Sequence, residues 1–208
     1  METGMADFAH RAARSPDPLT LETVEEYDLY CHYVAGLVGE GLSRLFSATG
    51  KEVASLADQL DLSNSVGLLL QKTNIIRDFR EDADQGRFFW PREIWGSAEY
   101  TADGRPPSGD VLELLRDPRR AAWAQSGMIL DALRHVCGAL DYLRLLRNQS
   151  VFNFVAIPIT MAIATLDLCF MNPAMFERNI KIRKARAAEV RCVSPLTTVS
   201  ASFHHYSL

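Results

Sequence analysis

One stretch of the chain, Val66–Trp95, is apolar at helical spacing and yet carries a line of polar and acidic side chains. Its apolar members are Val66, Leu68, Leu69, Leu70, Ile75, Ile76 and Phe79. Its polar line follows at spacings of three, four and four residues and consists of Gln71, Asn74, Asp78 and Asp82. Such spacing places the polar side chains along one face of a helix, so we expect a helix that is buried on several sides and faces a polar interior. Because no strand-like alternation of any length occurs in the sequence, the chain is predicted to be all-α, with roughly six to eight helices.

The acidic end of this stretch, with Asp78, Glu81 and Asp82, is typical of half of a magnesium–diphosphate site. Crowded carboxylates repel one another, so a site that gathers them usually holds a hard cation. Mg²⁺ prefers oxygen ligands and often bridges one or two carboxylates to a substrate phosphate. A solvated acidic helix end is the competing interpretation, and on the acidic residues alone it stays open. The apolar surroundings and the aligned Gln71 and Asn74 favour the metal site.

Composition and motif content exclude several classes of protein function. The 208 residues are 48% hydrophobic and 23% charged, which is ordinary for one soluble domain with a sizeable core. The net charge of −4 argues against a nucleic-acid partner. The cysteines form no CxxC pair, the histidines show no zinc spacing, and P-loop, Rossmann and serine-hydrolase motifs are absent.

A long helical pattern over residues 21–48 is the second predicted element, with Thr20 as its expected N-cap. Tyr30 falls on its interior face, where its hydroxyl would meet an apolar cavity or a neighbouring side chain. Three glycines interrupt the pattern: Gly36, Gly39 and Gly41. Each costs about 1 kcal/mol relative to alanine inside a helix, so they indicate close backbone approach, either to another helix or to a ligand.

Residues 151–171 are long and apolar enough for a membrane span, but Asn153, Pro158 and Asp167 interrupt them. We therefore expect a central buried helix that lines an apolar cavity. Phe152 and Phe154 on it are core residues by default; facing a cavity, their rings would stabilise a carbocation. The basic run over residues 177–191 is either a phosphate-binding patch or a solvated helix.

Four stretches of sequence together form a specific pattern. They are YCHYVAGLVGEGLSRLF at 30–46, LLLQKTNIIRDFREDADQGRFFWPREIW at 68–95, RNQSVFNFVAIPITMAIATL at 147–166 and KIRK at 181–184. In these stretches the chain resembles the squalene synthases, a family of head-to-head prenyl transferases. The resemblance runs from about Gly4 to Glu189, nearly the whole chain.

This resemblance implies one all-α isoprenoid-synthase domain around a central cavity. It implies a Mg²⁺-dependent condensation of two farnesyl diphosphates to presqualene diphosphate, followed by reduction with NADPH to squalene in sterol biosynthesis. It also implies a monomer at the cytosolic face of the endoplasmic reticulum membrane.

The resemblance also assigns roles to particular residues. By this match, the catalytic side chains are Tyr30 for the first half-reaction and Phe154 for the second, supported by Phe152. The expected metal ligands are Asp78, Glu81 and Asp82, and the expected diphosphate neighbours are Gln71 and Asn74. The expected NADPH-binding side chains are Arg77, Lys181 and Arg183.

The sequence also departs from the family pattern. The first of the family's two aspartate-rich motifs is not found in it, nor is the C-terminal membrane anchor. We therefore expect residues 1–190 to form part of a single isoprenoid-synthase domain, truncated at its N-terminus, and residues 191–208 to form a divergent tail. Two alternatives stay open: a phytoene- or dehydrosqualene-type synthase, and a non-catalytic helical protein that binds prenyl diphosphate or a partner.

Overall fold

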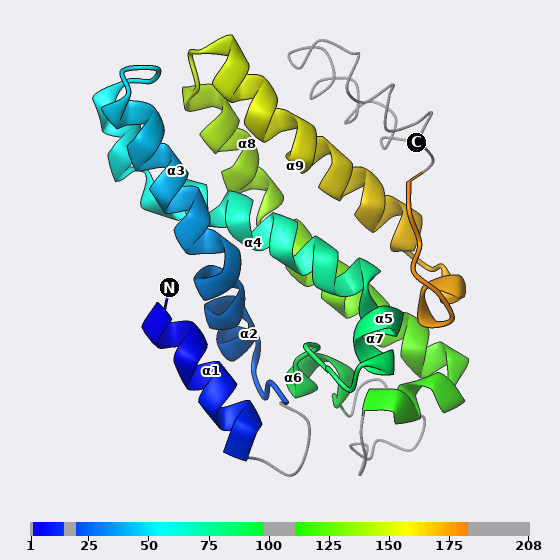
Figure 1. Cartoon of the computed structure of the whole chain (residues 1–208). Coiled ribbons are helices and arrows are strands. Elements are labelled where there is room, and N and C mark those ends of the chain that lie inside the picture. Colours follow the sequence, from blue (N-terminus) through cyan, green and yellow to red (C-terminus); the bar gives the residue numbers. More distant parts are fainter. Residues whose placement is uncertain (1, 15–19, 98–110, 183–208) are drawn as a thin grey trace.

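The computed structural model describes residues 2–14, 20–97 and 111–182, and these residues form helices and turns without any strand. Helix α4 (Leu60–Arg77) runs through the middle of the fold. Helices α3 (Leu37–Ala48), α8 (Val136–Leu145) and α9 (Gln149–Cys169) pack against it (Figure 1). The predicted all-α class is confirmed for the part of the chain that is described.

Burial explains why α4 is the central element. Its buried side chains lie on several sides of the helix and include Val66, Leu69, Thr73 and Ile76. A helix that is apolar on most sides must be covered on most sides, and α4 is contacted by α2, α3, α5, α7, α8 and α9. The expectation of a helix buried on several sides is therefore confirmed.

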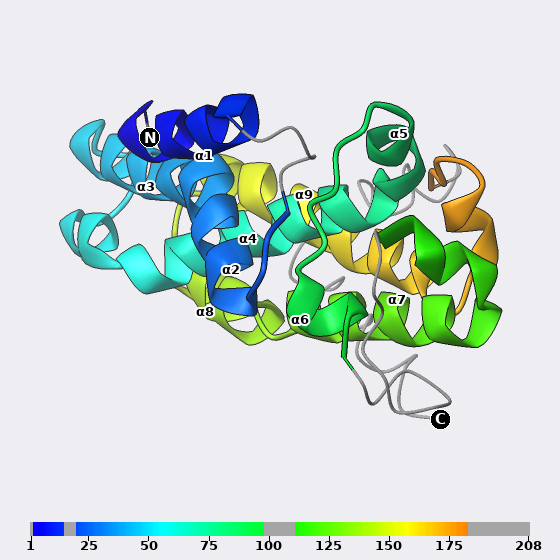
Figure 2. The ribbon, with the colours of Figure 1, turned by 90° about the horizontal axis from the view of Figure 1, so that it is seen from below.

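The N-terminal elements form one flank of the molecule. Helix α1 (Glu2–Arg14) lies beside α2 (Val24–Cys31), and a π-helical turn, η1 (His32–Gly36), joins α2 to α3 (Figure 2). The expected N-cap at Thr20 is wrong, because Thr23 holds that position and its side chain accepts a hydrogen bond from the Glu26 amide at 3.1 Å. The π-helical turn interrupts the α-helical period after Cys31, the residue that follows Tyr30.

Two of the three glycines mark the crossing with α4. A Cβ on Gly36 would collide with the Asn64 side chain, and a Cβ on Gly39 would lie 2.6 Å from the Ser63 carbonyl oxygen. Gly67 on α4 faces Gly36 from the other side, since a Cβ on Gly67 would lie 2.7 Å from the Gly36 Cα. The close approach is therefore to another helix and not to a ligand. Gly41 meets nothing within 4 Å, so packing does not explain it.

The central pattern breaks at Asp78, where α4 ends and the short α5 (Phe79–Asp84) begins. A 3-10 turn η2 (Ala54–Asp58) precedes α4, and α6 (Arg92–Trp95) follows α5. Beyond the undescribed residues 98–110 come η4 (Val111–Arg116), α7 (Pro118–Leu133), α8, α9 and η5 (Pro173–Phe176). Within the described ranges there are nine α-helical segments, more than expected, because breaks such as that at Asp78 divide patterns that look continuous in the sequence.

Helix α9 is long and apolar enough, by length and composition, to cross a membrane. In the fold, however, it packs against α4 and α8, and its buried face includes Val155, Ile159, Ala162 and Leu166. This agrees with the expected core packing of residues 151–171, with the helix bounded at Gln149 and Cys169, whereas the apolar cavity expected along it stays a prediction.

A charge network inside the fold joins α2, α4 and α7. The fully buried ammonium of Lys72 contacts the carboxylates of Asp28 and Asp131, the latter at 2.5 Å, and lies 4.9 Å from the centre of the Tyr27 ring. Arg134 pairs with both carboxylates from the solvent side. The network fixes α2, which carries Tyr30, against α4, which carries the polar line.

The charges of this network also affect His135, and this leads to a prediction of how the stability of the fold depends on pH. Burial, and then the nearby Lys72 charge, lower the pKa of His135 from 6.5 to about 4. Between these values the unfolded chain binds a proton at His135 that the native chain does not, so stability falls as the pH falls from about 6.5 to about 4. Because the ring is partly exposed, we expect His135 to account for only about 1–2 kcal/mol of this loss.

Urea unfolding at pH 7 and pH 4.5 would measure the effect. His135→Gln should lose less stability between the two pH values than the parent chain does. The matched control is His10→Gln, at an exposed position on α1, which should keep the parent's pH dependence. Equal pH dependence in His135→Gln and the parent would contradict the assignment.

Candidate functional site: an acidic cavity at the end of the central helix

A cavity of about 430 Å³ opens where α4 ends and α5 begins. It is lined by Tyr30, Gln71, Asn74, Ile75, Arg77, Asp78, Asp82, Arg87 and Phe89. The predicted polar line of the central stretch therefore converges on one cavity, although the helix breaks within it. Tyr30 reaches the same cavity from α2.

Asp78 is held by side chains from two directions. Arg77 binds it with two hydrogen bonds, from Nε to Oδ1 at 2.7 Å and from Nη2 to Oδ2 at 2.5 Å. The Asn179 amide donates to Asp78 Oδ1 at 2.8 Å and to Glu81 Oε2 at 3.0 Å. The bond to Asp78 is the main reason that the pKa of Arg77 is raised. Asp78 and Glu81, both predicted metal ligands, are thus joined through a side chain that comes from the far end of the described chain, although Glu81 is exposed and does not itself line the cavity.

The negative charge of Asp82 is less well compensated than that of Asp78. Arg87 donates to its Oδ1 from Nη2 at 2.6 Å and from Nε at 3.1 Å. Burial nevertheless raises the pKa of Asp82, and the charges of Asp78 and Glu81 add to this rise, while Arg87 lowers it. A carboxylate with a raised pKa beside a second carboxylate is a group that added positive charge would stabilise.

Tyr30 lies in an aromatic setting at the cavity wall. Its ring stacks on Phe89, with centroids 5.2 Å apart and planes 22° apart, and meets the edge of Phe8 on α1 at 5.3 Å. Burial is the first cause of the raised pKa of Tyr30, and the Cys31 and Asp82 charges also raise it. The hydroxyl therefore keeps its proton at neutral pH and can donate a hydrogen bond to an anion in the cavity.

The donor set fits a hard cation that shares its shell with water or phosphate. Among the described residues, no three carboxylate, imidazole or thiol groups lie close enough to hold a metal by themselves. However, the cavity presents the carboxylates of Asp78 and Asp82 together with the amides of Gln71 and Asn74, all with oxygen donors. Mg²⁺ usually keeps several waters and needs one or two carboxylates plus substrate phosphates.

The remaining predicted residues lie apart from the cavity or outside the described chain. Phe154 is exposed near the start of α9 and meets Phe46 of α3 edge to face at 6.1 Å, while Phe152 is half-buried against the core. The start of α9 lies about 30 Å along the helix from its end. Lys181 is exposed and does not line the cavity, and Arg183 lies outside the described residues.

Comparison with known proteins identifies the family. A family model described as squalene/phytoene synthase matches residues 1–186. The chain belongs to the squalene/phytoene synthase family. The expected resemblance and the isoprenoid-synthase helical fold are therefore confirmed.

Its relatives in this family are named squalene synthases. The chain is 58% identical to squalene synthase of Ganoderma lucidum in an alignment of 194 positions that covers 91% of this chain and 41% of that protein. It is 49% identical to squalene synthase of Schizosaccharomyces pombe, covering 91% of this chain and 40% of that protein. A solved complex of TcSQS with the ligand E5700 matches with a TM-score of 0.80 and 43% identity, over 93% of this chain and 53% of the other. The chain thus spans about two fifths of these sequence relatives and about half of the solved structure.

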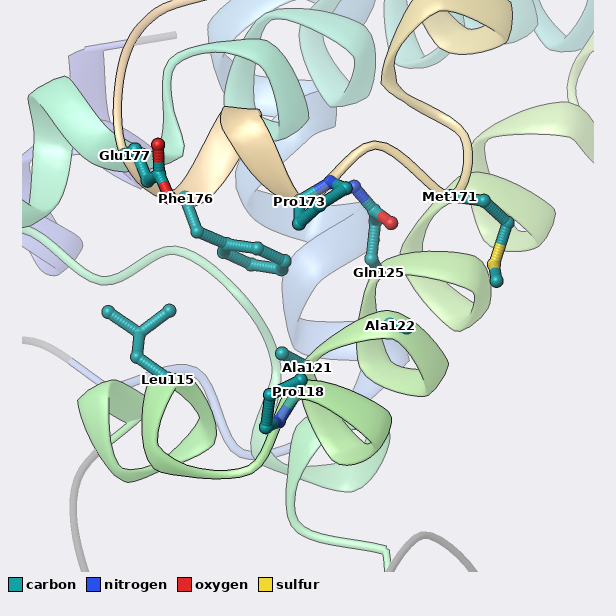
Figure 3. A pocket seen from close by; sticks show the side chains of 9 residues that line it. All are labelled: Leu115, Pro118, Ala121, Ala122, Gln125, Met171, Pro173, Phe176 and Glu177. Carbon is teal, nitrogen blue, oxygen red and sulfur yellow. The ribbon is translucent and has the colours of Figure 1, made fainter.

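This member of the squalene/phytoene synthase family has a second cavity, of about 390 Å³, between α7, η4 and η5 (Figure 3). Its wall is mostly apolar and includes Leu115, Ala121, Pro173 and Phe176. Gln125 supplies an amide there, but its nitrogen already donates to the carbonyl oxygens of Cys169 at 2.8 Å and Asn172 at 3.2 Å. None of the predicted site residues lines this cavity, so the acidic cavity is the better candidate.

Sequence reasoning assigned no site role to four polar or aromatic residues of the acidic site. Arg87 and Phe89 lie in the GRFFWP turn, whose position directly after the acidic run was a usable signal. Phe8 and Asn179 carry no such signal, because they reach the site from opposite ends of the described chain.

Proposed function

We propose that the acidic cavity is the diphosphate-binding part of a squalene synthase, which condenses two farnesyl diphosphates to presqualene diphosphate and reduces it to squalene. The convergence of Asp78, Asp82, Gln71 and Asn74 on one cavity beside Tyr30 carries this proposal. The names of the relatives support squalene as the product, in preference to the phytoene- or dehydrosqualene-type alternative.

Different residues of the cavity would bind different parts of a magnesium diphosphate. Asp78 and Asp82, with Glu81 beside them, would hold Mg²⁺, which when bound neutralises the charge of the leaving diphosphate. Gln71 and Asn74 offer amide hydrogen bonds to its oxygens, and Arg77 and Arg87 add positive charge near them.

Tyr30 contributes from the apolar side of the site. Because its pKa is raised, its hydroxyl stays protonated and can orient the diphosphate by donating a hydrogen bond. Phe89 and Phe8 cover its ring and exclude water from it. Phe154 and Phe152 stay proposed as aromatic walls for the carbocation that precedes reduction.

NADPH fits the described residues less well. Arg77 is engaged by Asp78 and Lys181 is exposed elsewhere, so the two offer the cofactor no shared cradle. NADPH stays proposed as the reductant on the family pattern alone. A monomer at the cytosolic face of the endoplasmic reticulum membrane is proposed on the same basis.

Product analysis tests the proposal. The purified chain is incubated with farnesyl diphosphate, Mg²⁺ and NADPH, and presqualene diphosphate and squalene are detected by mass. We expect both products, with squalene dependent on NADPH, and a loss of at least about 100-fold in turnover for Asp78→Asn, because the removed charge is one that the diphosphate site needs.

Asp84→Asn is the matched control, since Asp84 is an exposed carboxylate of α5 that pairs with Arg80 and does not line the cavity. It should keep the parent's turnover. A phytoene-like product, formed with or without NADPH, would favour the second type of synthase. Farnesyl diphosphate binding without any product, from a folded sample, would favour the non-catalytic alternative and overturn the proposal.

A further inference from the structure

Asn179 connects two parts of the molecule that the proposed function uses separately. It lies between η5 and Lys181, in the segment 177–182, and its amide nitrogen donates one hydrogen bond to Asp78 and one to Glu81. The two partners lie at the end of α4 and on α5. No other described side chain is hydrogen-bonded to both Asp78 and Glu81.

The orientation of this amide follows from the chemistry of its partners. Ionised carboxylates accept hydrogen bonds and cannot donate them, so the nitrogen and not the oxygen of Asn179 must face them. The amide oxygen is buried and has no hydrogen-bond partner among the described residues. Leaving a buried oxygen unsatisfied is unfavourable, so the two charge-assisted bonds of the nitrogen must outweigh that cost.

Two apolar anchors flank Asn179 and limit where its segment can lie. On one side, the Phe176 ring meets the edge of Phe79 at 5.3 Å and lies 6.0 Å from Trp90. On the other side, Ile180 is buried in the core. The bonds of Asn179 are the polar link between these anchors, and Lys181, the residue after Ile180, is exposed. The described part of this segment ends the orange stretch of Figure 1.

The bonds of Asn179 leave room for a cation. Asp78 Oδ1 accepts from both Arg77 and Asn179, but Oδ2 accepts one bond, from Arg77. Each carboxylate oxygen has two lone pairs, so Asp78 Oδ2 and both oxygens of Glu81 keep accepting capacity. Partners of this kind orient metal ligands without touching the metal, and their loss typically weakens metal binding 10- to 100-fold.

We propose that Asn179 is a positioning residue, which orients Asp78 and Glu81 for the cation and fixes the segment 177–182 to the same carboxylates. This rests on the proposed function insofar as it concerns the cation. Because binding effects are reciprocal, a cation that orders the two carboxylates also holds the segment more firmly. Cation occupancy of the acidic cavity and the position of Lys181 are therefore coupled.

Two measurements on Asn179→Ala test this. The first is hydrogen exchange of the amides of residues 177–182 without metal, which should speed up at least tenfold. The second is Mn²⁺ binding in the presence of inorganic diphosphate, by calorimetry, which should weaken about tenfold. Added Mn²⁺ should slow exchange at 177–182 in the parent chain and not in Asn179→Ala, while exchange at 78–84 slows in both.

Arg178→Gln is the matched control, because Arg178 is the exposed neighbour in the same segment, and it should keep the parent's exchange rates. In a Glu81→Ala background, Asn179→Ala should speed metal-free exchange less than it does in the parent, because the two residues share one bond.

The possible failures are distinguishable. Metal-free exchange that is as slow in Asn179→Ala as in Arg178→Gln would overturn the link to the segment. Parent-like Mn²⁺ affinity in Asn179→Ala would overturn the positioning of the cation ligands. If the parent chain itself binds no Mn²⁺, the proposed metal site fails and the coupling fails with it, whereas the metal-free exchange still decides the link.

Discussion

Replacing Lys72 by methionine should destabilise the chain by about 3–5 kcal/mol, the usual cost of removing one partner from a buried charge pair. The Lys72 ammonium is fully buried between Asp28 and Asp131, and Asp131 is itself only 6% exposed. Methionine fills much of the lysine volume but leaves Asp131 with Arg134 as its remaining charge partner. Equilibrium urea unfolding at pH 7 measures the loss.

The same network supplies the control. Arg134 pairs with the same two carboxylates, but its side chain is 54% exposed. Arg134→Met should therefore cost at most about 1 kcal/mol. Lys72→Met made together with Asp131→Leu should cost much less than Lys72→Met alone, because no unpaired buried charge remains. If Lys72→Met and Arg134→Met cost the same, the buried ammonium does not have the role assigned to it.

Lys72 also shows where prediction from sequence stops. Lysine is almost never fully buried, so nothing in the local pattern marks this one. Its partners are 44 residues before it and 59 residues after it, and only the packing of three helices brings them together. Distant pairs of this kind are a property of the tertiary fold and leave no periodic signal.

By contrast, the line of Gln71, Asn74, Asp78 and Asp82 was predictable, since helical spacing alone brings them to one face. The prediction held across the break at Asp78, because Asp82 on α5 still lines the same cavity as Gln71 and Asn74 on α4. Helical periodicity is therefore enough to predict the polar and acidic side chains that α4 and α5 contribute to the site. It cannot yield Phe8 or Asn179, which enter the site through long-range packing.

The aromatic pair on α9, Phe152 and Phe154, shows a different limit of prediction from sequence. The sequence places Phe152 and Phe154 in an apolar helix, and the resemblance assigns them to catalysis. In the described structure Phe154 is exposed beside Phe46 near the start of α9 and does not line the acidic cavity. A pattern of apolar residues predicts burial of a helix face but does not say which side chains on it will share a cavity with a distant carboxylate.

Gly67→Ala is expected to destabilise the chain by about 2–4 kcal/mol, because the crossing of α4 with the η1 turn has no room for a methyl group. A Cβ on Gly67 would lie 2.6 Å from the Ala35 carbonyl oxygen and 2.7 Å from the Gly36 Cα. Both are backbone atoms, so relief requires the two helices to move apart. That movement would shift Tyr30, which lies in the last turn of α2 before η1, relative to the polar line of α4.

Gly41→Ala is the natural comparison, since a Cβ there meets nothing within 4 Å. It should stabilise the chain by about 0.5–1 kcal/mol through helix propensity alone. The two substitutions are chemically identical, so their difference in urea midpoint isolates the close approach at Gly67. Tyr30 provides a second readout: if the helices separate, Mn²⁺–diphosphate binding should weaken in Gly67→Ala and not in Gly41→Ala. Equal stability of the two variants would mean that α4 and η1 can separate at little cost, and that the glycine does not set the position of Tyr30 over the acidic cavity.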